Sequence, residues 1–396
     1  MREASIAKQA GAVQSVVDWL IDGARTVRQP QEVLAELCHR LVAAGLPLYR
    51  VAVFVRTLHP NVMGRRFLWR QGEGVQVSEA PYAMLDTDTY RASPIPVVFA
   101  TERPIRRRIA DPDCPDDYQI IAELRAEGVT DYLVHPLPFA NGEVHAASWT
   151  TQRAGGFTDG DIAALEAVRL PFARLAEIYA LRRIATTLLS TYVGSSTGER
   201  ILQGRIRRGD LERIHAVILL SDLRGFTGLS DRLPGEQVIG LLNSYFDGLV
   251  PAIEAEGGEV LKFTGDGLLA IFPVAAAPAA ACRAALAAVG TGRATLAECN
   301  TQRRERNEPE LRSGMALHQG EVLYGNVGSA ARLDFTAIGP AVNLTARLET
   351  LARDLGRDLV VSATFATHCP EAVASLGTFQ LRGFREAVEV FAPTGE

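Results

Sequence analysis

The sequence predicts a chain of two α+β domains joined by a long helix, and three observations support this prediction. First, 396 residues are more than one hydrophobic core usually organises. Second, apolar residues make up 47% and charged residues 22% of the chain, so both halves can bury a core. Third, helix and strand patterns occur in both halves, on either side of a helical stretch over 161–193. We expect domains over 1–160 and 200–396, with a connector over 161–199.

The first domain shows the element order of a small α+β sensory domain. Helical patterns cover residues 5–45, with a break near Pro30. The patterns that follow are strands at 49–56 and 66–70, a helix at 118–127, and strands at 132–137 and 143–150. Residues 72–116 contain several prolines and turn residues and show no clear pattern.

In this layout, and in the run Glu127-Gly-Val-Thr-Asp-Tyr-Leu-Val, the first domain resembles a GAF domain, with a PAS-like fold as the alternative. The resemblance implies regulation by a small molecule or a protein, which the sequence does not identify. The basic run from Arg103 to Arg108 is either an anion-binding segment or a solvated face.

The connector carries apolar or small residues at spacings of three and four, which is close to a heptad seam. These residues are Leu165, Val168, Phe172, Leu175, Ile178, Leu181, Ala185, Leu188 and Tyr192. We expect a parallel two-stranded coiled coil that transmits a signal between the domains. The alternative is a last helix of the first domain that packs on its own sheet.

The second domain alternates strand and helix patterns. We expect a strand at 215–221, a helix at 229–256, a hairpin at 259–273, a helix at 276–305, strands at 312–319 and 321–327, and a helix at 340–354. Two helices against an antiparallel sheet predict a ferredoxin-like core.

Two acidic residues follow apolar strand patterns in this domain. Asp222 stands after the run 216–220, and Asp266 lies in a tight turn of the predicted hairpin. A hairpin turn beside the end of a strand brings two carboxylates together, where they repel unless a proton or a cation lies between them. Such oxygen ligands suit Mg²⁺ or Mn²⁺. On spacing alone, Asp222 as a helix cap and Asp266 as a turn residue remain the alternative.

Asn343 and Arg347 lie four residues apart on the predicted helix 340–354 and therefore share a face. An amide and a guanidinium group on one face can hold the sugar and the phosphates of a nucleotide. The alternative is a solvated helix face.

Three motifs now stand in order: Asp222-Leu-Arg-Gly-Phe-Thr227, Lys262-Phe-Thr-Gly-Asp-Gly267 and Gly339-Pro-Ala-Val-Asn343-Leu-Thr-Ala-Arg347. Together they resemble the catalytic domain of the class III adenylate and guanylate cyclases, from about Arg200 to the C-terminus. The resemblance implies an enzyme that converts ATP to 3′,5′-cyclic AMP and pyrophosphate.

The resemblance also implies a role for each matching residue on the phosphate side of the site. Asp222 and Asp266, with the backbone carbonyl of Leu223, match the ligands of two divalent cations, Mg²⁺ or Mn²⁺. The backbone amides of Phe226 and Thr227, at a helix start, match the positions that meet the triphosphate.

On the nucleoside side, Lys262 and Thr336 match the two positions that read the purine. Glu and Cys at these positions go with guanine, whereas Lys with Asp or Thr goes with adenine. Thr336 departs from the commoner Asp, so the preference for ATP is less sharply specified. Asn343 matches the residue that orients the ribose, and Arg347 the residue that stabilises charge on the phosphates in the transition state.

The family's arrangement takes the aspartates from one subunit and the other positions from its partner. A homodimer, joined through the catalytic domain and the connector, is therefore expected. The alternatives are a guanylate cyclase and a catalytically silent nucleotide-binding dimer.

Charge and composition limit the location and partners. A formal charge of −5 argues against nucleic acid as the main partner. Five scattered cysteines favour a reducing compartment. The longest apolar stretch, 271–282, is too short to span a bilayer and the N-terminus lacks a signal peptide pattern, so we expect a cytoplasmic protein.

Overall fold

The structure is a computed structural model that describes residues 2–275 and 277–394. The chain divides into two compact units, Met1–Leu188 and Leu189–Glu396. Each unit has its own sheet and its own hydrophobic core. No helix in the described part of the chain is long and apolar enough to cross a membrane.

The first unit is built on a six-stranded antiparallel sheet of order β3-β2-β1-β6-β5-β4. Its strands are β1 (Arg50–Arg56), β2 (Val62–Arg70), β3 (Gly74–Pro81), β4 (Ile105–Arg107), β5 (Asp131–Pro138) and β6 (Val144–Thr151). Its helices are α1 (Arg2–Ile21), α2 (Pro30–Ala43), the 3₁₀ turn η1 (Tyr82–Asp86), α3 (Asp88–Arg91), α4 (Pro94–Thr101), α5 (Ile120–Ala126) and α6 (Asp159–Val193). The segment without a clear sequence pattern therefore contains β3, β4 and three short helical elements.

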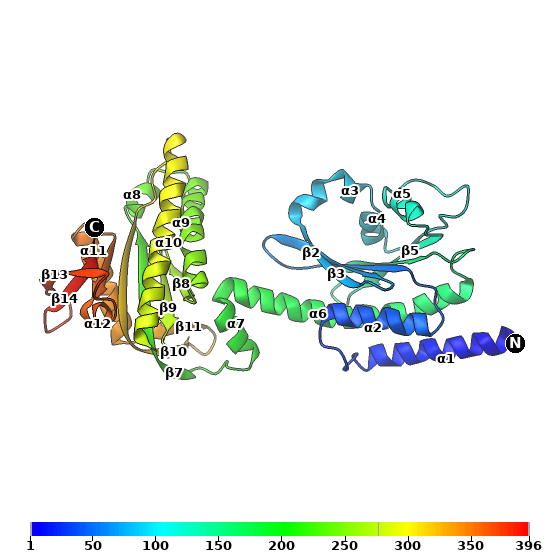
Figure 1. Ribbon diagram of the computed structural model, residues 1–396, viewed down its shortest axis with the longest axis horizontal. Coiled ribbons are helices and arrows are strands. Elements are labelled where there is room, and N and C mark those ends of the chain that lie inside the picture. The colour runs from blue at the N-terminus through cyan, green and yellow to red at the C-terminus, as the bar shows by residue number, and fades with distance from the viewer. Residues whose placement is uncertain (1, 276, 395–396) are drawn as a thin grey trace. The chain divides into compact units, whose positions relative to one another are not determined.

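Helices cover both faces of this sheet (Figure 1). On one face α1, α2 and α6 pack against strand residues such as Val53 and Trp149. On the other face α4 and α5 pack against residues such as Val134 and Ala146. Because β6 is covered on both faces, each of its eight residues is buried. The GAF-like assignment of residues 1–160 stays a prediction.

The first half of the expected seam on α6 packs inside its own unit. Leu165, Val168, Phe172 and Leu175 are buried in the core formed with α1, α2 and the sheet. The alternative assignment, a last helix packing on its own sheet, therefore holds for this stretch, because the sheet offers it an apolar face. From residue 178 onward the seam is mostly exposed, with Ile178 61% and Leu181 53% exposed, although Leu188 is half-buried. A coiled coil over this second half stays a prediction.

The second unit is built on an eight-stranded sheet of order β13-β14-β12-β10-β7-β9-β8, with β11 paired to β10. Its strands are β7 (Leu211–Leu223), β8 (Glu259–Thr264), β9 (Gly267–Pro273), β10 (Ser313–Gly328), β11 (Leu333–Ile338), β12 (Leu359–Ser362), β13 (Val373–Phe379) and β14 (Val388–Pro393). Its helices are α7 (Ser195–Leu202), α8 (Phe226–Ser230), α9 (Gly235–Ala255), α10 (Pro278–Glu305), α11 (Pro340–Asp354) and α12 (Ala363–Ala366).

Two long helices, α9 and α10, lie side by side against one face of this sheet (Figure 1). Alternate residues of β7, including Val217 and Leu219, pack beneath them. The intervening residues, including Ala216 and Ile218, pack on the other face with β11 and the start of α11. Asp222 lies an even number of residues after Ala216 and Ile218 on the same strand, so its side chain is on this second face.

Two elements differ from the sequence prediction. The two strands expected at 312–319 and 321–327 are one strand, β10 (Ser313–Gly328), which continues through Gly320, where α11 packs directly on it. A Cβ at Gly320 would lie 2.8 Å from the Cβ of Ala341 on α11. The helix expected over 229–256 is instead two helices, α8 and α9, with a break before Pro234, because proline has no N–H to donate and its ring clashes with a preceding helical turn.

Candidate active site

The carboxyl groups of Asp222 and Asp266 lie together at one end of the central strands. Asp222 is opposite Gly267 in the β7–β9 pairing, directly beside the turn that holds Asp266. The backbone N–H of Leu223 donates to the carbonyl oxygen of Asp266 at 3.1 Å, which ties that turn to the end of β7. The two side chains are within hydrogen-bonding reach of each other.

The electrostatics of this pair suit a cation. Burial, and then the neighbouring charge of Asp266, raise the pKa of Asp222 above its usual value. Arg353 and Arg224 act in the opposite direction, and two half-buried carboxylates in one place repel each other unless a proton or a cation lies between them. Hard oxygen donors of this kind fit Mg²⁺ or Mn²⁺.

Gly267 makes the close approach of the hairpin to β7 possible. A Cβ at this position would lie 2.3 Å from the backbone oxygen of Ser221 and 3.3 Å from Oδ1 of Asp222. No side chain fits there, since backbone atoms cannot rotate away. Behind the strand, the hydroxyl groups of Ser221 and the buried Tyr245 are in hydrogen-bond contact, which anchors this end of β7 to α9.

A third carboxyl group, which sequence reasoning missed, lies beside the pair. Burial, and then the charge of Asp222, raise the pKa of Glu349 on α11. Arg224 approaches Glu349 at 3.5 Å and also donates to the carbonyl oxygen of Arg357 at 3.0 Å. Glu349 has no motif signal, because its place depends on how α11 packs on the sheet.

Glu349 does not complete a metal cluster with the aspartates. Within the described ranges, no group of three or more His, Cys, Asp or Glu residues is arranged to hold a metal ion. A cation at Asp222 and Asp266 would therefore need further oxygen ligands from water, from the Leu223 carbonyl or from phosphate groups. Sites that bind Mg²⁺ through one or two carboxylates plus substrate phosphates have this composition.

Lys262 and Thr336 lie on two strands that contact each other, β8 and β11. The Nζ of Lys262 is 3.5 Å from Oδ2 of Asp334, two residues before Thr336. Thr336 is only 3% exposed, and its hydroxyl group has no hydrogen-bond partner among the described residues. A buried hydroxyl without a partner is costly. A polar group of a ligand would satisfy it.

Asn343 and Arg347 are exposed on α11, which begins directly after β11. Glu349, two residues beyond Arg347, is the residue of this helix that lies beside Asp222. Residues two apart on an α-helix point about 200° apart around its axis. Asn343 and Arg347 therefore do not face the aspartate pair of their own chain.

Phe226 and Thr227 are the first two residues of α8, which follows Gly225 in a left-handed conformation with φ of 73°. The first amides of a helix have no partner within the helix, so they are available to a ligand. This helix has only five residues and lies three residues beyond the end of β7.

The comparisons with known proteins concern this half of the chain. The profile of the family described as "Adenylate and Guanylate cyclase catalytic domain" matches residues 211–391. The chain is similar to adenylate cyclase 1 of Rhizobium meliloti (strain 1021), with 31% identity over 46% of this chain and 28% of that protein. It is also similar to an adenylate cyclase of Anabaena cylindrica, with 30% identity over 44% of this chain and 34% of that protein. The chain thus spans about a third of these curated relatives.

Solved structures match the same region. The adenylyl cyclase CyaB from P. aeruginosa matches 47% of this chain and 97% of its own length, with 26% identity and a TM-score of 0.41. The guanylyl cyclase Cya2 matches 46% and 92%, with 31% identity and a TM-score of 0.41. From the three motifs and the family profile, we conclude that residues 211–391 of this chain belong to the class III adenylate and guanylate cyclase catalytic domain family.

Proposed function

We propose that the chain is an adenylate cyclase that converts ATP to 3′,5′-cyclic AMP and pyrophosphate. The observation that carries the proposal is the pairing of Asp222 and Asp266 at the end of the central strands, in a domain of the cyclase family. Two divalent cations at these residues and the Leu223 carbonyl would lower the pKa of the ribose 3′-hydroxyl group and neutralise the phosphates.

The other residues act on the nucleotide itself. The 3′-oxygen attacks the α-phosphorus, and its proton passes to water. The bond between the α-phosphorus and the oxygen that bridges to the β-phosphate breaks, and pyrophosphate leaves. Lys262 and the unsatisfied hydroxyl of Thr336 bind the adenine edge, and Asn343 orients the ribose. Arg347 stabilises the charge that shifts onto the phosphates, an effect worth several kcal/mol in enzymes of known mechanism.

We further propose that the active site is shared between two copies of the chain. The orientation of α11 supports this, because Arg347 points away from the aspartates of its own chain while Glu349 points toward them. Exposed apolar side chains on the strands that carry Lys262 and Thr336 add support: Phe263 is 54% exposed, and Leu333 and Ile338 are each 38% exposed. A symmetric dimer would cover them and create two equivalent sites.

Mixing two inactive variants tests the shared site. Asp222→Ala removes a cation ligand, and Asn343→Ala removes the ribose contact, so each homodimer should be inactive. Random pairing makes half of the dimers mixed, each with one intact site, so activity should return to about a quarter of the wild-type value. No recovery in samples where native mass spectrometry detects mixed dimers would refute the shared site.

Product analysis tests the reaction itself. Purified protein is incubated with Mn²⁺ and either ATP or GTP, and the products are identified by mass. Cyclic AMP from ATP supports the proposal. Cyclic GMP alone would make the protein a guanylate cyclase, and no cyclic nucleotide from either would indicate a silent nucleotide-binding dimer. We propose that the first unit, 1–188, regulates this activity.

A further inference from the structure

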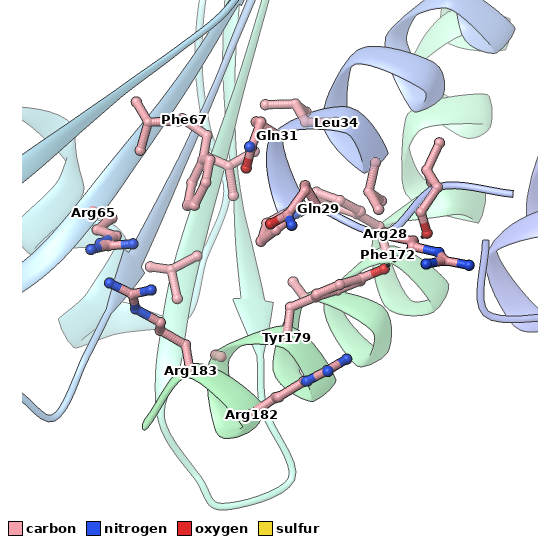
Figure 2. A pocket seen from close by; sticks show the side chains of 18 of the residues that line it. Arg28, Gln29, Gln31, Leu34, Arg65, Phe67, Phe172, Tyr179, Arg182 and Arg183 are labelled. Atoms are coloured by element: carbon pink, nitrogen blue, oxygen red, sulfur yellow. Dashed lines mark hydrogen bonds between the residues drawn. The ribbon is translucent and has the colours of Figure 1, made fainter. Parts of the chain in front are cut away.

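A large cavity opens in the first unit, far in sequence from the catalytic motifs. It has a volume of about 1030 Å³ and lies between α2, α6 and the strands β1, β2 and β3 (Figure 2). This is the size of a pocket for an organic ligand, since such pockets typically measure about 300–1,000 Å³.

The cavity is lined by six arginines and, among the lining residues that the structure describes, by no aspartate or glutamate. The arginines are Arg25, Arg28, Arg56, Arg65, Arg182 and Arg183. They come from the loop before α2, from β1 and β2, and from α6. So many guanidinium groups around one space give it a positive potential that favours an anionic ligand.

Neighbouring acids neutralise only two of these arginines. Arg25 pairs with Asp22 at 3.2 Å, and Arg65 pairs with Glu79. The guanidinium groups of the other four, Arg28, Arg56, Arg182 and Arg183, form no ion pair with any side chain that the structure describes. In Figure 2 the side chains of Arg65 and Arg183 point toward each other across one end of the cavity.

The basic run predicted from the sequence at 103–108 differs from this cluster. Arg106 there pairs with the fully buried Asp131 at 2.6 Å, and Arg107 pairs with Asp117. These two arginines hold the fold together and are not available to a ligand. Arg108 is exposed and lies outside the cavity.

Apolar groups form the floor of the cavity. Phe67 of β2 and Phe172 and Tyr179 of α6 contribute rings, and Val53 and Val55 of β1 contribute aliphatic side chains. Figure 2 shows Phe67 and Tyr179 between the arginines of the two ends. A charged ligand without an apolar part would leave this floor in contact with water.

We propose that this cavity binds a small phosphorylated organic molecule whose phosphate lies among the arginines and whose apolar or aromatic part lies on Phe67 and Tyr179. Guanidinium groups bind phosphate oxygens through paired, charge-assisted hydrogen bonds. Gln29, Pro30 and Gln31, at the N-terminal end of α2, also line the cavity. The ligand therefore bridges α2, the sheet and α6.

The position of the site also suggests how a ligand would act. Arg182 and Arg183 lie on α6 shortly before the second unit begins at Leu189. A phosphate bound to them restrains this end of the helix against β2. Ligand binding itself is independent of the proposed cyclase activity, so the two proposals are tested separately.

Calorimetric titration of the full chain with phenyl phosphate tests the site, because this probe combines a dianion with one aromatic ring. The test variant is Arg182→Gln/Arg183→Gln, which changes two exposed residues and should fold normally. The matched control is Arg103→Gln/Arg108→Gln, which removes the same charge from exposed positions of the same unit outside the cavity. A third variant, Ala180→Trp, keeps every charge and places an indole ring in the space that the ligand would share.

We expect saturable binding that weakens at least about tenfold in the test variant and is unchanged in the control. Ala180→Trp should weaken binding, and phenol, which has the ring without the charge, should not bind. The proposal is overturned if phenyl phosphate does not saturate, if both double variants bind equally well, if Ala180→Trp binds like wild type, or if phenol binds as tightly. Binding at the catalytic site would not respond to any of these first-unit changes.

Discussion

Replacing Gly267 by alanine should push the aspartate pair apart. The added Cβ would lie 2.3 Å from the backbone oxygen of Ser221, whereas ordinary contacts of a Cβ begin at 3.4 Å. The hairpin must therefore move away from β7 by roughly 1 Å, because neither backbone atom can rotate aside. Overpacking of this kind costs about 1–3 kcal/mol of stability. A 1 Å displacement of catalytic groups lowers turnover by about a hundredfold.

Gly265→Ala is the matched control two residues earlier. A Cβ there meets nothing within 4 Å, but the backbone has a φ of +70°, so alanine adds about 1–2 kcal/mol of conformational strain without a clash. Both variants should lose similar stability, yet only Gly267→Ala should lose most of its turnover. The comparison separates damage to the fold from displacement of Asp266 relative to Asp222.

Two spectroscopic signals follow the two units separately. All three tryptophans, Trp19, Trp69 and Trp149, lie in the first unit, so their fluorescence reports that unit alone. Urea unfolding is followed by fluorescence and by far-ultraviolet circular dichroism, and turnover is measured well below the transition. Gly267→Ala should leave the fluorescence transition of the first unit unchanged. It should shift the part of the dichroism transition that comes from the second unit. Wild-type stability together with wild-type turnover in Gly267→Ala would refute the close approach of the hairpin to β7.

Two further predictions concern base selection and pH. The double substitution Lys262→Glu/Thr336→Cys should reverse the ratio of kcat/KM for ATP to that for GTP; an unchanged ratio would show that these residues do not read the base. Burial lowers the pKa of His145 to about 4, and its Nδ1 accepts a hydrogen bond from the Arg56 backbone at 3.0 Å. In the unfolded state this histidine takes up a proton near pH 6.5, whereas in the folded state it stays neutral down to about pH 4. Its contribution to the free energy of unfolding is therefore complete above pH 6.5 and is lost as the pH falls toward 4. The loss is about 2 kcal/mol between pH 7 and pH 5. His145→Asn, whose oxygen can accept the same hydrogen bond, should reduce that loss, as measured by the urea midpoint of tryptophan fluorescence; an unchanged pH dependence would contradict the assignment.

The sequence predicts best those helices and hairpins whose ends and turns are formed by residues close together in the chain. The helix expected over 340–354 is α11, Pro340–Asp354, since a proline begins it and its apolar periodicity is clear. The hairpin expected over 259–273 is β8 and β9, joined by the turn around Asp266. The edge strand β3 was missed, because its residues are mostly exposed and its apolar alternation is limited to Val75 and Val77.

The sequence by itself determined the cyclase family and the helix that carries Asn343 and Arg347, since each motif consists of residues close together in the chain. The pairing of β7 with β9 places Asp222 beside Asp266, which the spacing alone left open. Only the tertiary structure decided that Glu349 lies beside Asp222, that the first half of the α6 seam is buried, and that six arginines surround one cavity. Those arginines are spread over residues 25–183, and neither their spacing nor their neighbours mark them as a group. Long-range packing of helices on a sheet brings them together, and no local pattern encodes that packing.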